Sequence, residues 1–310
     1  MIRKHTRRAA KAAFAISLGV AIVIGLLAAT VRPASGAPRA GTITIGTKNF
    51  PEEFILGQLY KQALEAKGFT VKYKENIGST ELIYTALKSK KIDFYPEYTG
   101  VVVQVINHKT LSPKTARATF LLAKSLEAKK GITVANPTPF FDTDVLAVTN
   151  ATAKKYGLKS VGDLKKVGPF KLGGFPECKT RNTCFLGYTK QYGVSNATFV
   201  PLAGISAYAA LDSRKVLAAD VFSTDPPLAK PSKYTVLADP KHVTGFQNVV
   251  PLIRTAVVTQ EGSTLTSTVN AVSAKISQNA ILAMNKAVIV NKKSPAAVAK
   301  AFLQANGLLE

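Results

Sequence analysis

The chain has 310 residues with two cysteines and no tryptophan, and its 41 Lys and Arg residues outnumber 18 Asp and Glu residues. The lysines are scattered among acidic residues, and no basic run is interleaved with aromatic residues, which argues against nucleic-acid binding. We interpret the positive charge as a solvated surface that faces an anionic cell envelope.

The N-terminal segment has the layout of a secretory signal. An apolar run without charge covers residues 12–30, small residues follow at 34–37, and the basic head that precedes them contains Arg3, Lys4, Arg7, Arg8 and Lys11. This order predicts an exported chain with cleavage after Ala37. The apolar run is also long enough to span a bilayer, so residues 1–37 could instead stay as an uncleaved anchor. Either alternative places the rest of the chain outside the cytoplasm, in the periplasm or at the cell surface.

Strands and helices alternate after Gly41. The pattern predicts strands over 42–47, 69–73 and 92–95, with helices over 51–68 and 79–89 between them. Pro51 suits the first turn of its helix, because proline needs no hydrogen-bond donor there, and Gly68 is a natural stop. A βαβαβ order of this kind predicts a parallel sheet with helices on its faces.

The alternation restarts in the second part of the chain. A long helix over 112–130 precedes a strand over 145–149, and further strands are expected near 170–175, 197–202, 218–227 and 249–257, followed by three helical segments. We therefore predict two α/β lobes joined by a two-stranded hinge, with residues 41–143 and 251–310 in lobe 1 and 144–250 in lobe 2. Ligands of such sheets bind at the carboxyl ends of the strands, here in the cleft between the lobes.

No catalytic motif is present. The sequence has no GxSxG, HExxH, phosphate-binding glycine loop or paired-cysteine zinc motif, and its histidines lie apart from candidate nucleophiles. We expect no enzymatic activity, no cofactor and no metal. In an exported chain the close pair Cys178 and Cys184 favours a disulfide over a metal site. Such a bridge would stabilise the fold by about 2–3 kcal/mol and stiffen the loop that holds Arg181.

Polar and aromatic residues gather where strands are expected to end. They are Lys48-Asn49-Phe50, Gly78-Ser79-Thr80-Glu81, Tyr95 to Gly100, Asp142-Thr143-Asp144, Phe222 to Asp225 and Phe246-Gln247-Asn248. Each group also has a simple structural explanation. The first group could be no more than the start of a helix, Ser79 could cap the next helix, and Asp225 before Pro226 could form a plain turn. Their convergence on one edge of the sheet favours a binding site.

The same residues resemble a known family. The stretches IGTKNFPEEFILGQLY, NIGSTELIYTALKSKKIDFYPEYTG, PFFDTDVLAVT, FSTDPPL and NVVPLIR occur in an order similar to the substrate-binding proteins of ABC importers for quaternary amines such as glycine betaine, choline and carnitine. The resemblance covers about residues 42–310. It implies an α/β, two-lobe periplasmic-binding-protein-like fold of type II, with two mixed sheets joined by a two-stranded hinge.

The ligand class that the resemblance implies explains the aromatic residues. A trimethylammonium group has no N–H to donate, so it is held best by the faces of aromatic rings. In this family Lys48 and Arg181 match cationic residues that face a ligand carboxylate, Tyr98 matches a ring of the aromatic cage, and Asp142 matches an acid that accompanies it.

The sequence also departs from the family pattern. Asp144 stands where betaine binders typically have tyrosine, Phe222 replaces another tyrosine, Phe246-Gln247 stands where tyrosine is common, and Val101 replaces a hydroxyl residue. We predict ligand contacts from Lys48, Tyr98, Asp142, Asp144, Arg181, Phe222 and Gln247. Secondary candidates are Asn49, Ser79, Thr80, Thr99, Thr143 and Phe246. The acid at 144 leaves open whether the ligand is glycine betaine or another polar or amine-bearing metabolite.

The resemblance further implies the partners. The expected protein is a monomer that binds a small molecule and delivers it to a membrane permease driven by an ATPase. A sensory binding protein held by an uncleaved anchor is the alternative.

Overall fold

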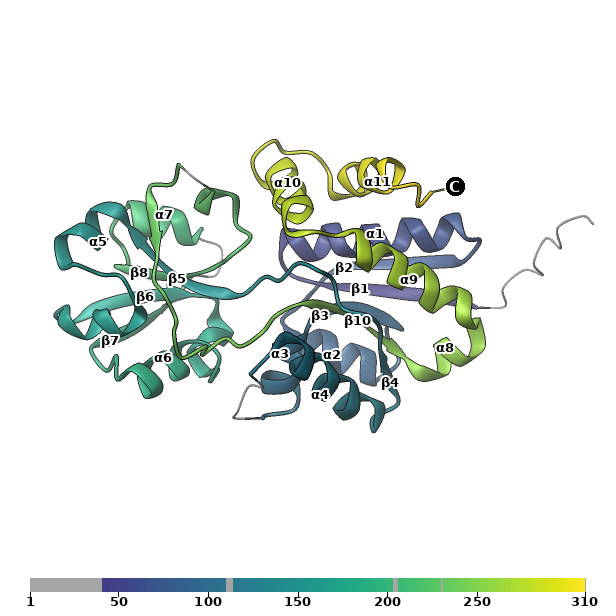
Figure 1. Ribbon diagram of the computed structural model, residues 1–310, viewed down its shortest axis with the longest axis horizontal. Coiled ribbons are helices and arrows are strands. Elements are labelled where there is room, and N and C mark those ends of the chain that lie inside the picture. Colours follow the sequence, from purple (N-terminus) through teal and green to yellow (C-terminus); the bar gives the residue numbers. More distant parts are fainter. Residues whose placement is uncertain (1–40, 110–113, 203–205, 230, 310) are drawn as a thin grey trace, which may run out of the picture. The chain divides into compact units, whose positions relative to one another are not determined.

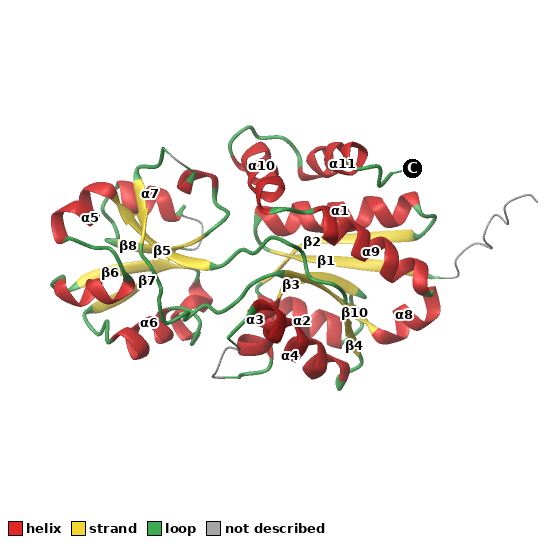
Figure 2. Cartoon of the chain, viewed as in Figure 1, coloured by secondary structure: helices red, strands yellow, loops and turns green. Residues whose placement is uncertain are grey.

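The computed structural model describes residues 41–109, 114–202, 206–229 and 231–309. They form two five-stranded sheets with helices packed on the faces (Figures 1 and 2). The predicted signal or anchor lies outside these residues. Within the described ranges, none of the helices has the length and apolar character needed to cross a membrane.

The first sheet has the strand order β2-β1-β3-β10-β4. Its strands are β1 (Thr42–Lys48), β2 (Thr70–Gly78), β3 (Phe94–Tyr98), β4 (Ile132–Val134) and β10 (Val249–Arg254). The first three are parallel, as the βαβαβ pattern predicts, and β10 runs antiparallel to β3 and β4. The sheet is therefore mixed, because the chain returns to it from the second lobe in the opposite direction.

Helices cover both faces of the first sheet (Figure 1). One apolar layer lies under α1, and α9, α10 and α11 pack against that helix. The layer on the opposite face lies under α2 and α4. The helices of this lobe are α1 (Pro51–Ala66), α2 (Thr80–Lys88), α3 (Thr99–Val101), α4 (Ala116–Ala128), α8 (Thr255–Glu261), α9 (Ser263–Lys275), α10 (Gln278–Ile289) and α11 (Pro295–Ala305).

The second sheet has the strand order β7-β6-β8-β5-β9 and also carries an apolar layer on each face. Its strands are β5 (Asp144–Thr149), β6 (Phe170–Gly174), β7 (Ala197–Pro201), β8 (Ala218–Phe222) and β9 (Tyr234–Val236). Helices α5 (Asn150–Tyr156), α6 (Phe185–Tyr192) and α7 (Ala207–Asp212) join them, with short 3₁₀ turns over Val161–Lys166, Pro176–Thr180 and Pro226–Leu228.

Two antiparallel segments carry the chain between the sheets (Figure 2). Phe141 and Asn248 form a single β-bridge, and the Asp142 amide donates to the Gln247 carbonyl at 3.1 Å. The predicted fold class, two mixed sheets joined by two strands, is confirmed. The exact limits of the two lobes along the chain stay a prediction.

Several bounds of the expected elements are wrong. β2 continues to Gly78 instead of ending at 73, β8 ends at Phe222 instead of 227, and β10 ends at Arg254 instead of 257. The third strand continues to Tyr98 instead of ending at Tyr95, because the buried carboxylate of Glu97 finds partners within the sheet. A π-helical turn, Val102–Ile106, extends α3, and the short edge strand β9 has no strong sequence pattern. Four helices instead of three follow β10, because Gly262 divides the first of the expected segments into α8 and α9.

Candidate functional site

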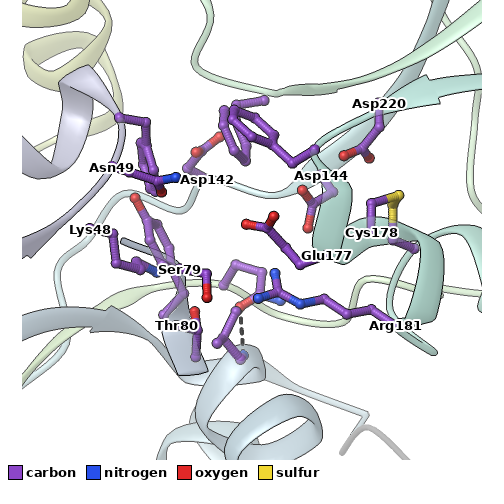
Figure 3. A pocket seen from close by; sticks show the side chains of 17 residues that line it. Lys48, Asn49, Ser79, Thr80, Asp142, Asp144, Glu177, Cys178, Arg181 and Asp220 are labelled. Carbon is purple, nitrogen blue, oxygen red and sulfur yellow. Dashed lines mark hydrogen bonds between the residues drawn. A yellow bond between two sulfur atoms is a disulfide. The ribbon is translucent and has the colours of Figure 1, made fainter. Parts of the chain in front are cut away.

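A pocket that is partly open to solvent is lined by residues of both lobes (Figure 3). All seven primary site residues predicted from the sequence line it, as do Asn49, Ser79 and Thr80. They come from the ends of β1 and β3, the start of α2, the two crossing segments, the disulfide loop and the end of β8. The structure thus brings together residues that lie about 200 positions apart, as expected for the carboxyl edge of a sheet.

Lys48 forms the basic end of the pocket but is already paired. Its Nζ donates to Glu97 Oε1 at 2.6 Å and lies 3.9 Å from Glu53 Oε1, with all three side chains buried. Register explains the pair, because Ile45 is opposite Phe94 in the parallel strands β1 and β3, which puts residue 48 level with residue 97. Glu97 also accepts hydrogen bonds from the amide of Tyr98 and the hydroxyls of Tyr95 and Thr80. Removing one partner of a buried pair costs about 3–5 kcal/mol, so this ion pair is a fixed part of the fold.

Four aromatic rings form a row along the pocket. Phe50 stacks on Phe222 with ring centroids 5.0 Å apart and an angle of 27°, and it also stacks on Tyr98 at 6.3 Å. Phe175 continues the row at 5.8 Å from Phe222. Lys48 Nζ lies 4.3 Å from the centroid of the Tyr98 ring, so an internal cation already uses that ring.

Glu52 is a buried acceptor behind the aromatic row. It accepts hydrogen bonds of 2.7 Å from each of the Tyr98 hydroxyl, the Thr224 hydroxyl and the Asn285 amide. Burial raises the pKa of Glu52, while these three donors lower it. The pKa of Asp142 is raised well above its usual range, first by burial and then by the nearby charge of Glu52. The Ser223 hydroxyl and the Thr224 amide donate hydrogen bonds to Asp142 and oppose this shift.

Arg181 lines the pocket from the second lobe and is also paired. Its Nη2 donates to both oxygens of Glu81, at 2.9 and 3.0 Å. Glu81 belongs to α2 of the first lobe, so this ion pair connects the lobes. The Ser79 hydroxyl donates to Glu81 at 2.6 Å. Ser79 occupies the cap position of α2 without a capping side-chain bond, so its structural explanation as a helix cap is not supported.

Three carboxylates of the second lobe lie near Arg181 (Figure 3). Asp144 begins β5, Asp220 lies on β8, and Glu177 comes from the 3₁₀ turn beside Cys178. Burial raises the pKa of Asp144, and Arg181 and Lys48 oppose this shift. The pKa of Asp220 is raised well above its usual range by burial and by the charge of Asp144.

The remaining predicted residues support the crossing segments. Gln247 lines the pocket, and its side chain accepts from the Val101 amide and donates to the Thr244 carbonyl. Thr99, Thr143 and Phe246 do not line this pocket. Thr99 donates to the Phe246 carbonyl at 2.9 Å, and Thr143 shares a hydrogen bond with Thr244. They fasten the end of β3 and the start of β5 to the returning chain.

The predicted disulfide between Cys178 and Cys184 is present, with the Cα atoms 5.2 Å apart. Both residues line the pocket. The bridge closes the short loop that carries Arg181, and Glu177 lies directly before it.

Seven residues of the pocket lining were not selected from the sequence as ligand contacts. Cys178 and Cys184 were expected only as a disulfide and Val101 only as a departure from the family pattern; the other four are Phe50, Phe175, Glu177 and Asp220. Asp220 was detectable, because it lies two positions before Phe222 on the same strand and therefore on the same face. Glu177 and Phe175 carry no such pattern, since they lie in and directly before the 3₁₀ turn Pro176–Thr180 instead of on a strand.

The chain is similar to known proteins over nearly its whole length. Residues 41–305 match the family described as the substrate binding domain of ABC-type glycine betaine transport systems. A glycine-betaine-binding protein of Pseudomonas aeruginosa is 31% identical over 89% of this chain and 92% of its own length. The glycine betaine-binding protein YehZ of Escherichia coli is 27% identical over 86% of this chain and 92% of its own.

Solved structures agree with the fold. The crystal structure of a glycine betaine/carnitine/choline ABC transporter protein covers 86% of this chain and all of its own, with a TM-score of 0.68 at 23% identity. Apo YehZ from Escherichia coli has a TM-score of 0.62 at 25% identity and covers 87% of this chain. From the family match and the Pseudomonas relative, the chain belongs to the substrate-binding proteins of glycine betaine-type ABC transporters.

Proposed function

We propose that this protein captures a small cationic amine in the pocket between its lobes and delivers it to an ABC permease driven by an ATPase. The charge of the ligand is inferred from one observation: both basic residues of the described pocket lining already have a carboxylate partner. Lys48 is bound to Glu97, and Arg181 is bound to Glu81. Asp142, Asp144, Glu177 and Asp220 add acidic groups to the same lining. The balance favours a cation.

Among the ligands named for relatives, a quaternary amine without a carboxylate, such as choline, fits this balance better than glycine betaine. At Lys48, a ligand carboxylate would have to displace Glu97, which is costly because both partners are buried. At Arg181 it could accept a hydrogen bond from Nε, which is buried without a partner among the described residues, but it would share the guanidinium charge with Glu81, which is bound to Nη2. Glycine betaine therefore remains a weaker candidate that depends on Arg181.

The aromatic row supplies the surface for the alkylated cation. Phe50 and Phe222 are too close for a trimethylammonium group to enter between them, so the ligand contacts the row on its pocket side. Each ring contributes about 0.5–2 kcal/mol when it faces a cation. We assign this role to Phe222 first, because Lys48 Nζ already lies 4.3 Å from the ring centroid of Tyr98 and 5.5 Å from that of Phe50.

The export and transport parts of the proposal rest on the family and on the N-terminal sequence. The basic head and apolar run of residues 1–37 support export to the periplasm or the cell surface. No enzymatic role is proposed, and a monomer suffices because one chain supplies every residue of the pocket lining described above.

A thermal-shift screen tests the proposed function directly. The purified full chain is heated with choline, carnitine, glycine betaine and uncharged sugars, because a ligand that binds the folded state raises the unfolding midpoint. We expect choline to give a larger shift than glycine betaine and sugars to give none.

Variants of two phenylalanines assign the site. Phe222→Ala should remove most of the rise in unfolding midpoint that choline produces. Phe185→Ala is the control and should keep this rise, because it removes a ring that packs against Phe199 in the second-lobe core and does not line the pocket. A choline shift that survives Phe222→Ala, or a screen in which no amine binds, would contradict the proposal.

A further inference from the structure

We propose that Asp220, Asp144 and Glu177 form a second subsite beside the disulfide, which binds an ammonium group that carries N–H donors. The ligand would then combine an alkylated cation on the aromatic row with a primary or secondary amine on these carboxylates. This inference rests on the proposed function and narrows its ligand class.

Strand register puts the two aspartates on one face. Asp144 of β5 lies opposite Phe222 of β8, and Asp220 precedes Phe222 by two positions. Residues opposite one another, and residues two apart, share a face of a sheet, so Asp144, Asp220 and Phe222 point to the same side. The aromatic row and the acidic group are therefore adjacent parts of one surface, within reach of a single small ligand.

The side chain of Asp220 is the feature that points to a ligand. The residue is only 3% exposed, and its Oδ1 is buried without a hydrogen-bond partner among the described residues. A buried carboxylate oxygen without a donor is unfavourable, so such groups are rare unless a bound molecule supplies the donor. Asp220 lines the pocket, and Figure 3 shows its carboxylate beside the bridged Cys178 and near Asp144.

The local packing holds this arrangement in place. A Cβ atom at Gly174 would lie 3.1 Å from Cβ of Asp220 and 3.3 Å from Sγ of Cys178, closer than most Cβ contacts. The absence of a side chain at 174 therefore lets β8 and the disulfide loop approach each other. Glu177 is part of that loop, and Figure 3 shows its carboxylate between Asp144 and Arg181.

The chemistry of the group favours an organic cation over a metal ion. Among the described residues, the side chains close enough together to hold a metal are Cys178, Cys184 and Asp220, and both sulfur atoms are used in the disulfide. Arg181 is bound to Glu81, so it does not neutralise the three acids fully. The positive charge of a ligand ammonium would offset the effect of burial and of Asp144, which together raise the pKa of Asp220.

A fully alkylated amine cannot fill this subsite. A trimethylammonium group has no hydrogen to donate and would leave Asp220 Oδ1 without a partner. A primary ammonium has three donors and can reach several carboxylate oxygens at once. The subsite therefore selects for N–H groups, which the aromatic row does not.

Two matched compounds test the inference on the purified full chain. (3-Hydroxypropyl)trimethylammonium and (3-aminopropyl)trimethylammonium differ only in a hydroxyl against a protonated amine. Calorimetry should show the amine binding about tenfold tighter or more, because hydrogen bonds between charged groups are the strong ones. Asp220→Asn should bring the two affinities close together. Asp212→Asn, which removes an exposed acid of the same lobe that bonds Lys233, should keep the difference.

The outcomes separate this inference from the proposed function. The subsite would be overturned if the unmodified protein bound both compounds equally well, or if Asp220→Asn did not change the preference for the amine. In either case, binding of the hydroxyl compound would leave the proposed function standing. Binding of neither compound would overturn both. Ligand-free Asp220→Asn should unfold at the same or a higher temperature, because it replaces an unpaired buried acid. A marked loss of stability would instead show a structural role and refute the assignment.

Discussion

Replacing Glu81 by glutamine should change which ligands the protein prefers. In the structure Glu81 holds the Nη2 of Arg181 with two hydrogen bonds, and a ligand carboxylate would need the same guanidinium group. The uncharged amide introduced by Glu81→Gln cannot neutralise Arg181, so the substitution leaves the guanidinium available. We expect glycine betaine to bind tighter to Glu81→Gln, relative to choline, than to the unmodified protein.

The size of the effect follows from the exposure of the pair. The Arg181 side chain is 19% exposed and the Glu81 side chain 53%. An ion pair that is partly solvated contributes about 0.2–1 kcal/mol, and 1 kcal/mol corresponds to a factor of about five in affinity. The ratio of the choline to the glycine betaine dissociation constant should therefore rise by up to about fivefold.

Isothermal calorimetry with both ligands measures this ratio. The ratio is needed because the Glu81–Arg181 pair also connects the lobes, and its loss can weaken the binding of every ligand to the same extent. Glu65→Gln serves as the control, since Glu65 pairs with Lys61 on α1 and does not line the pocket. A ratio that stays constant or falls would refute the reasoning that Glu81 competes with a ligand carboxylate.

Three further predictions concern the fold around the pocket. Lys48→Met should destabilise the protein by about 3–5 kcal/mol in urea unfolding, because Glu97 loses its partner. Adding Glu97→Gln to this variant should recover part of the lost stability. A Lys48→Met protein as stable as the unmodified one would contradict this prediction. Burial raises the pKa of Glu53 from 4.5 to about 8, so the folded state binds more protons than the unfolded state in that range. The unfolding temperature should then fall as the pH rises from about 4.5 to about 8, and Glu53→Gln should flatten this dependence; a midpoint that rises with pH would argue against it. Thiol titration of denatured, unreduced protein should find no free thiol, and reduction should cost about 2–3 kcal/mol of stability; two titratable thiols would disprove the bridge.

The sequence predicts the fold well because most of its elements have a regular apolar pattern. Strands such as Thr42–Lys48 and helices such as Pro51–Ala66 agree with their patterns to within about two residues. The error at Tyr95 has a different cause. A strand that contains Pro96 and Glu97 does not look buried, and only the pairing with Lys48, 49 positions away, makes it so.

The site is predictable in composition but not in pairing. The residues that surround the pocket can be found from strand ends and from the family resemblance. The charge state of the pocket cannot, because Arg181 looks free in the sequence and is bound to Glu81 from another lobe. The cage inferred from the family likewise differs from the row of stacked rings that Phe50 completes.

The three donors to Glu52 have a consequence for how the protein folds. They come from Tyr98, Thr224 and Asn285, which lie 46, 172 and 233 positions further along the chain. Contacts between residues so distant in sequence form late, since much of the chain must be ordered before they can be made. A chain that is synthesised from its N-terminus therefore cannot complete the wall of the pocket until α10 has emerged and docked. Binding activity would then be a property of finished molecules, and a chain truncated before Asn285 would leave Glu52 short of one donor.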